Sequence, residues 1–210
     1  MLIPVAVGVL AVGFAGWAAR RLLARLRRGV VLRSPVLELA CAALTGIGIA
    51  AVWPSATVIA VVWVGLLVVT LGAVDIAAHR LPDALTLSAI PITACLLALT
   101  RLLAPASGAL GTAAVAAVVV TGIFWGLAAL LPRAMGMGDV KLVPTLAMAA
   151  GYASVGAVLW WLMLAFGLGA AVAVLGLATR RLSLGSAIPF GPCLLAGCWL
   201  VLAFPALASL

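Results

Sequence analysis

Residues 55–74 read SATVIAVVWVGLLVVTLGAV and carry no charged side chain. A membrane-spanning helix needs about 20 apolar residues to cross the hydrocarbon core of a bilayer. Pro54 precedes this run and Asp75 follows it, so both of its ends are marked in the sequence. The stretch therefore predicts one transmembrane helix, bounded by a proline and a carboxylate.

Similar apolar runs fill most of the remaining chain. They cover residues 2–19, 37–53, 84–103, 109–131, 142–179 and 187–206. The run 142–179 is too long for a single span, and residues 151–156, which begin and end with glycine, offer a break within it. We therefore predict an all-α polytopic membrane protein with about eight transmembrane helices, forming one domain over residues 1–210.

The composition excludes several classes of protein. Of the 210 residues, 68% are hydrophobic and 8% are charged, so a soluble fold could not cover its own surface. Intrinsic disorder requires low hydrophobicity and is excluded as well. The four cysteines lie in apolar runs without a C-x-x-C pair, and His79 is the only histidine. We therefore expect no metal site and no disulfide framework.

The basic residues predict a topology. With the N-terminus outside and eight spans, eleven of the twelve Lys and Arg residues fall on the cytoplasmic side, and only Arg101 falls near the outer face. This asymmetry fits the positive-inside rule. A seven-span alternative would place Arg180 and Arg181 outside. The net charge of +8 is interpreted as topology and contact with anionic lipids, not as nucleic-acid binding.

The chain contains only four acidic residues: Glu38, Asp75, Asp83 and Asp139. The predicted topology places all four near the cytoplasmic boundary, where adjacent spans could bring two carboxylates together. In such a pair one carboxyl keeps its proton while the other stays ionised. The ionised group can then take a proton from water while the neutral group polarises a carbonyl.

Simpler roles are open for most of these acids. Asp83 follows Pro82, Asp139 follows Gly138, and each could cap the helix that it begins. Glu38 could be a first-turn acid or pair with a nearby arginine. Asp75 is harder to explain in this way, because it ends a predicted helix, where the helix dipole disfavours an anion.

Two segments that contain the aspartates, residues 75–83 and 136–141, resemble the motifs of the type IV prepilin peptidases. Residues 75–83, DIAAHRLPD, resemble the first motif, an Asp followed after a short gap by Ile/Leu-Pro-Asp/Asn. Residues 136–141, GMGDVK, resemble the second motif, G-x-G-D-x-K. Weaker similarities lie at residues 33–39, RSPVLEL, and 188–192, IPFGP. They occur in family order and indicate a peptidase core over about residues 30–200.

The resemblance implies an intramembrane aspartyl protease of the G-x-G-D type, with Asp75 and Asp139 as its catalytic pair. The substrate would be a prepilin or pilin-like precursor with a short basic leader and a hydrophobic helix. Cleavage would fall at their junction, at the cytoplasmic face of a bacterial inner membrane. The supporting motif residues would be Gly136, Gly138, Lys141, Pro82 and Asp83.

Roles can also be predicted for the supporting motif residues. Gly136 and Gly138 would let the backbone approach the substrate and adopt dihedral angles denied to other residues. Lys141 would either favour the charged form of Asp139 or extend to the membrane interface. The family motif tolerates Asn at the position of Asp83, which argues for a structural role there.

The sequence also departs from the long members of this family. Those members carry two C-x-x-C pairs before the core, and many methylate the new N-terminus of their product. No such pair precedes residue 30 or follows it here. We therefore expect a peptidase-only form, without zinc, without a cofactor and without methyltransferase activity.

Two other classes of protein are alternatives to the peptidase. A small proton-coupled transporter would use its acids to relay protons, and predicts acids near the centres of the spans and inverted repeats. A non-enzymatic membrane assembly protein would use all three aspartates as helix caps. It predicts that Asn, itself a good cap, replaces each with little loss.

Overall fold

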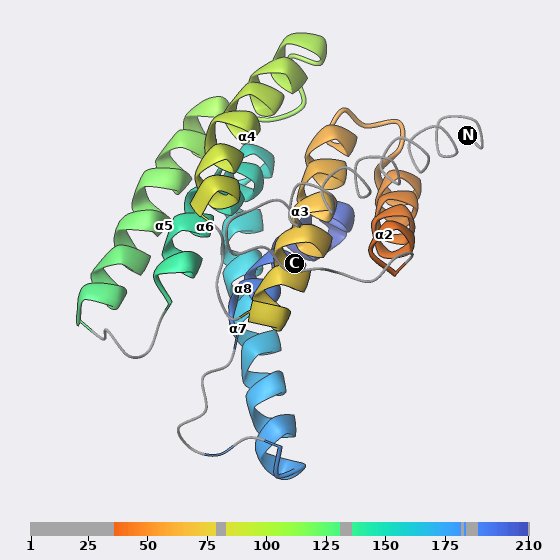
Figure 1. Cartoon of the computed structure of the whole chain (residues 1–210). Helices are drawn as coiled ribbons and strands as arrows, with labels where there is room; N and C mark the ends of the chain where they lie inside the picture. Colours follow the sequence, from red (N-terminus) through yellow and green to blue (C-terminus); the bar gives the residue numbers. More distant parts are fainter. Residues whose placement is uncertain (1–35, 79–82, 131–135, 182, 184–188, 210) are drawn as a thin grey trace.

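The computed structural model describes residues 36–78, 83–130, 136–181, 183 and 189–209 (Figure 1). This part of the chain is entirely helical. Its seven α-helices and one 3-10 helix are α2 Val36–Val52, α3 Val58–Ala78, α4 Asp83–Leu103, α5 Leu110–Leu130, α6 Met137–Ala153, α7 Val155–Ala178, α8 Gly191–Ala203 and η1 Pro205–Ser209. The predicted first span, residues 2–19, and the basic segment after it lie outside the described residues.

Each apolar run predicted from residue 37 onward coincides with a helix, and the prediction of an all-helical fold is confirmed. The break expected within residues 151–156 is also confirmed. Ser154 is extended, with φ −174° and ψ 167°, and its side-chain oxygen accepts a hydrogen bond of 2.9 Å from the backbone N–H of Ala157. This N-cap starts α7 immediately after α6 has ended.

Four of the described helices are long and apolar enough to cross a membrane. They are α3 over Val58–Asp75, α4, α5 and α7. The apolar part of α2, Leu39–Val52, and α8 are shorter. The described residues thus form a helical protein with several membrane-spanning segments.

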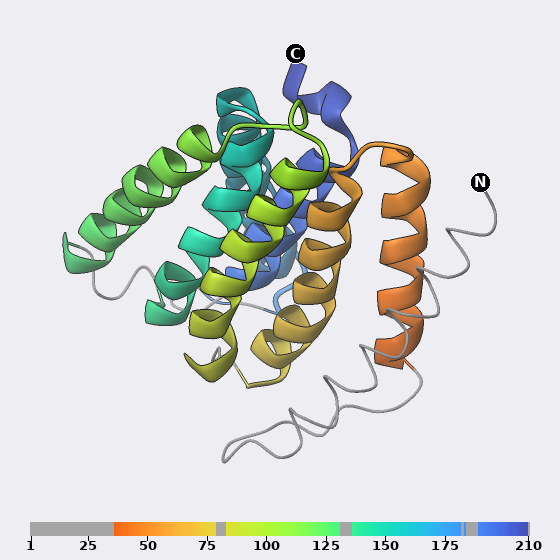
Figure 2. The same cartoon turned by 90° about the horizontal axis from the view of Figure 1, so that it is seen from above.

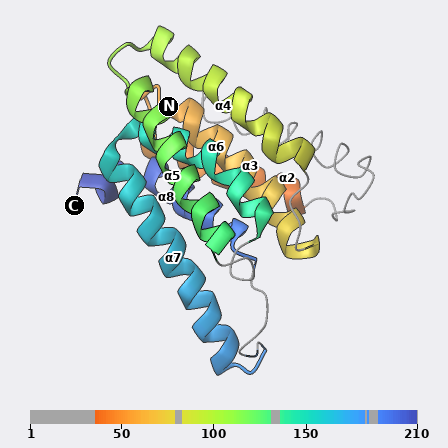
Figure 3. The ribbon, with the colours of Figure 1, turned by 90° about the vertical axis from the view of Figure 1, so that its left-hand side faces the viewer.

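Helix α8 lies inside the bundle, and other helices pack around it (Figure 2). It packs chiefly against α7 and α3 and also against α6. On α8, Trp199 is 6% exposed and lies against two glycines, Gly48 of α2 and Gly65 of α3. By contrast, the C-terminal end of α7 projects beyond the other helices (Figure 3).

Among the described helices, α5 and α6 make the most extensive contact with each other. Gly151 lets the two helices approach closely. A β-carbon at Gly151 would lie 2.6 Å from Ala116 Cβ and 2.9 Å from the carbonyl oxygen of Thr112, both on α5. The Thr112 hydroxyl also donates a 2.7 Å hydrogen bond to the Gly151 carbonyl. Small residues at such crossings let helix backbones approach closely in lipid.

We expect Gly151→Ala to lower the free energy of unfolding by about 1–3 kcal/mol, the usual effect of overpacking a close contact. The measurement is the unfolding of the purified protein in detergent micelles. Gly122→Ala is the matched control, since a β-carbon at Gly122 meets nothing within 4 Å. Equal stability of the two variants would show that the α5–α6 contact is looser than described.

Candidate active site

The first residue of the candidate site, Asp75, lies in the last turn of α3, which continues to Ala78. Its side chain is buried, with 6% of its surface exposed. A residue in the last turn of a helix cannot cap the beginning of that helix. The capping role that would explain an isolated aspartate is therefore excluded for Asp75.

The second residue, Asp139, is the third residue of α6 and is also buried, with 8% of its surface exposed. The N-cap position of α6 is occupied by Gly136, which excludes the alternative that Asp139 itself is the N-cap. Asp139 instead lies in the first turn, and its carboxyl forms a hydrogen bond with the backbone of Gly136. An acid at this position can reach back to the N-cap backbone, as in a capping box.

The two aspartates converge on Gly191, the first residue of α8. A β-carbon at Gly191 would lie 2.7 Å from Asp75 Oδ2 and 3.2 Å from Asp139 Oδ1. Because both distances start from one point, the two oxygens are at most about 6 Å apart, which is close enough for each carboxylate to influence the other. The structure therefore brings together the two acids that the sequence predicts as a pair.

The surroundings of the pair favour one proton shared between two carboxyls. Burial raises the pKa of Asp139 to about 7, repulsion by the Asp75 carboxylate acts in the same direction, and the hydrogen bond with Gly136 opposes them. Asp139 precedes the apolar run that begins at Leu142 and lies outside the candidate spans. The N-terminus of α8 meets the pair at Gly191, and its dipole stabilises the remaining negative charge.

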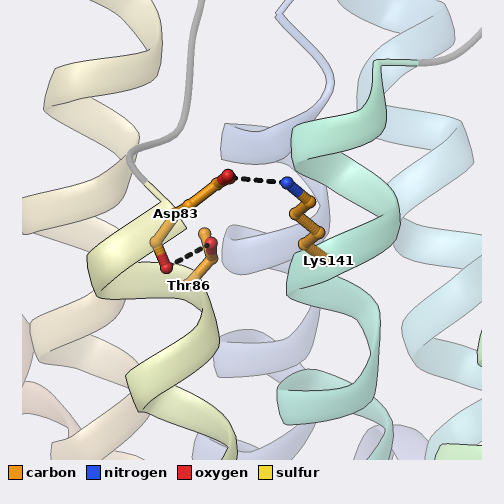
Figure 4. A network of polar contacts seen from close by, with 3 residues as sticks. All are labelled: Asp83, Thr86 and Lys141. Atoms are coloured by element: carbon orange, nitrogen blue, oxygen red, sulfur yellow. Dashed lines mark hydrogen bonds and ion pairs between the residues drawn. The ribbon is translucent and has the colours of Figure 1, made fainter.

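Lys141 makes a contact that the sequence did not predict. Its Nζ donates a 2.7 Å hydrogen bond to Oδ1 of Asp83, the first residue of α4, and forms an ion pair with it (Figure 4). The Thr86 hydroxyl lies 3.4 Å from the carbonyl oxygen of Asp83. Of the two roles left open for Lys141, an effect on Asp139 and extension to the membrane interface, neither includes this bond with Asp83.

The conformational role expected for Gly136 and Gly138 is wrong. No glycine among the described residues has a positive φ, and Gly136 has φ −74° and ψ 137°, which any residue can adopt. A β-carbon at Gly136 would make only ordinary van der Waals contact with Asp139 Oδ2, at 3.4 Å. Neither backbone therefore needs glycine for its dihedral angles.

Other predicted residues lie partly outside the described structure. Pro82 and His79 are in the connection between α3 and α4, outside the described residues. The backbone of Glu38 lies in the first turn of α2, but its side chain is not described. Three cysteines, Cys41, Cys193 and Cys198, are buried as expected of small apolar residues, whereas Cys95 is exposed.

The site residue that sequence reasoning missed is Gly191. Its signal was present in the segment 188–192, IPFGP, which was noted only as a weak similarity at the C-terminal end of the core. In the structure Phe190 occupies the N-cap position of α8, and a β-carbon at Gly191 would contact both carboxylates. Within the described ranges, no three His, Cys, Asp or Glu side chains are grouped so that they could hold a metal ion.

The fold and the site define a class: a helical protein with membrane-spanning segments and a buried pair of carboxylates near one end of its bundle. No family model, no curated protein and no solved structure matches the chain.

Proposed function

We propose that this protein is a membrane aspartyl endopeptidase of the type IV prepilin peptidase kind. The observation that carries the proposal is the convergence of Asp75 and Asp139 on Gly191, with their oxygens at most about 6 Å apart. A buried carboxylate is costly unless it has a function or a partner, and this chain has only four acids in total. Two of them share one buried site.

The pair can cleave a peptide bond without any other reactive group. Asp75, in its ionised form, takes a proton from a water molecule as the water oxygen attacks the scissile carbonyl carbon. Asp139, in its protonated form, donates a hydrogen bond to the carbonyl oxygen as negative charge develops there. The tetrahedral intermediate then collapses, the C–N bond breaks, and the leaving amine takes up a proton from the pair.

The substrate that fits this position is a precursor with a short basic leader and a hydrophobic helix. Eight spans with the N-terminus outside would place Asp75 and Asp139 at the cytoplasmic boundary of a bacterial inner membrane. A substrate helix lying in the bilayer would then present the junction with its cytoplasmic leader at the depth of the two carboxylates. We propose no methyltransferase step.

The test is cleavage in a defined system. The purified protein in lipid vesicles is incubated with a prepilin-like precursor, and the masses of the products are measured. We expect two fragments whose masses place the cut at the leader–helix junction. A precursor without its hydrophobic helix is the control and should stay intact. An intact full-length precursor after prolonged incubation with folded protein would contradict the proposal.

The proposed chemistry predicts a pH dependence. Asp139 must hold its proton to act, and burial followed by repulsion from Asp75 raises its pKa to about 7. The protonated form is present below this pKa, so cleavage should fall about tenfold per pH unit as the pH rises above it. The measurement is the initial cleavage rate from pH 5 to pH 9, with unfolding monitored in parallel. A rate that still increases at pH 9 would exclude Asp139 as the acid.

A further inference from the structure

The two helices that carry the carboxylate pair make little contact with each other. Helix α3, which carries Asp75 in its last turn, packs mainly on α8 and α2, whereas α6, which carries Asp139 in its first turn, packs mainly on α5, α4 and α8. Direct contact between α3 and α6 is slight. The separation of the two carboxylates therefore depends on the elements that join these helices indirectly.

A contact between neighbouring helices must also oppose the electrostatic repulsion between the Asp75 and Asp139 carboxyls. Two carboxyls brought into one buried site resist a second negative charge, and a small outward shift of α6 would relieve that repulsion. At this end of the bundle, Lys141 of α6 and Asp83 of α4 form an ion pair of 2.7 Å (Figure 4).

The ion pair lies in the right place to oppose such a shift. Lys141 follows Asp139 by two residues on the same helix, so it moves with the Asp139 backbone. Asp83 begins α4, and α4 packs against α3, the helix that carries Asp75. The bond thus links the helix of Asp139 to a helix that packs against the helix of Asp75.

We propose that Lys141 and Asp83 are positioning residues, forming a latch that holds the first turn of α6 against the first turn of α4 and so keeps Asp139 within reach of Asp75. This inference rests on the proposed function for its catalytic consequence, but not for its geometry. The two side chains are 33% and 62% exposed, and exposed ion pairs contribute little to folding stability. Breaking the latch should therefore change the site without unfolding the protein.

The first test follows cleavage. Lys141→Met and Asp83→Ala should each lower kcat by up to about fivefold, the scale on which an exposed ion pair acts, with little change in KM because substrate binding is kept. The exchanged variant, Asp83→Lys with Lys141→Asp, should recover most of the lost rate. Arg101→Met, at the other end of α4, is the matched control for losing a basic residue. An exchanged variant no better than the single variants would overturn the latch.

The second test measures geometry without any cleavage. Spin labels on Ala84→Cys of α4 and Met137→Cys of α6, both at exposed positions, report the α4–α6 distance by pulsed electron resonance. Cys95, the exposed cysteine, is first replaced by Ser. We expect one narrow distance with the latch intact and a broader, longer distribution with Lys141→Met. An unchanged distribution would overturn the proposal even if the wild-type protein cleaves its precursor.

The two tests separate the latch from the peptidase. If the wild-type protein cleaves nothing but the label distance broadens in Lys141→Met, the proposed function fails and the latch stands. If cleavage is normal in Lys141→Met and the distance is unchanged, the peptidase stands and the latch fails.

Discussion

Replacing Asp139 or Asp75 with Asn should each reduce cleavage by at least about a thousandfold, the scale on which removal of one member of a catalytic unit acts. An amide is close to a carboxyl in size, but it can neither take a proton from water nor deliver one to a leaving group. The substitution therefore tests chemistry while it preserves shape. The measurement is the rate of leader removal by the purified variants.

Stability separates a chemical loss from misfolding. Because Asp75 and Asp139 repel each other in a buried site, removing either charge should leave the unfolding midpoint unchanged or raise it. Asp83→Asn is the comparison substitution at the same end of the bundle. Its amide oxygen can still accept a hydrogen bond from Lys141, so we expect a loss of no more than about twofold. Full processing by a stable Asp75→Asn or Asp139→Asn variant would exclude the two-carboxylate mechanism.

Gly191→Ala should lower cleavage about a hundredfold, the effect of displacing a reacting group by about 1 Å. The added carbon would lie 2.7 Å from Asp75 Oδ2, a separation at which the carboxylate must move. It would also occupy the space between the two aspartates that a water molecule and the scissile carbonyl need. The measurement is kcat for the variant against the wild-type protein.

The control for Gly191→Ala is Gly167→Ala on α7, where a β-carbon meets nothing within 4 Å. Alanine is favoured over glycine within helices, so neither variant should lose folding stability for reasons of backbone conformation. We expect wild-type cleavage from Gly167→Ala. Wild-type cleavage from Gly191→Ala would mean that Gly191 is not part of the reacting site.

The helices were predictable because their signal is local. The uncharged run of residues 55–74 contains its own evidence for α3, and the break before α7 was marked by Ser154 between two glycines. The pairing of Asp75 with Asp139 was also predictable, although only from the scarcity of acids together with the motif resemblance. Composition and the motif resemblance thus led to the two acids that the structure brings together.

The remaining parts of the site depend on contacts between distant segments. Nothing near Lys141 in the sequence indicates that its partner is Asp83 at the start of another helix. Likewise, Gly191 lies next to Asp75 only because α8 packs inside the bundle against α3. The mistaken roles of Gly136 and Gly138 have a related cause, since glycine-rich motifs indicate freedom of the backbone but not whether the fold uses it.

The position of the acids also bears on the competing classes. A proton relay requires ionisable groups along the interior of the spans, whereas Asp75 lies in the last turn of α3 and Asp139 in the first turn of α6. A set of three helix caps fails at Asp75, which lies at a C-terminal end. The buried pair at the helix ends therefore favours our proposal of acid–base chemistry between two carboxyls.

Carbon-13 NMR of the aspartate carboxyls tests most directly whether Asp75 and Asp139 titrate as one pair. The chain contains only three aspartates, so labelled protein in micelles gives three carboxyl signals, assigned by Asn substitution. We predict that Asp139 titrates near pH 7 in the wild-type protein and at a lower pH in Asp75→Asn, where repulsion is lost. An Asp139 signal that titrates near its ordinary pKa of 3.8, at the same pH in both proteins, would contradict the pair.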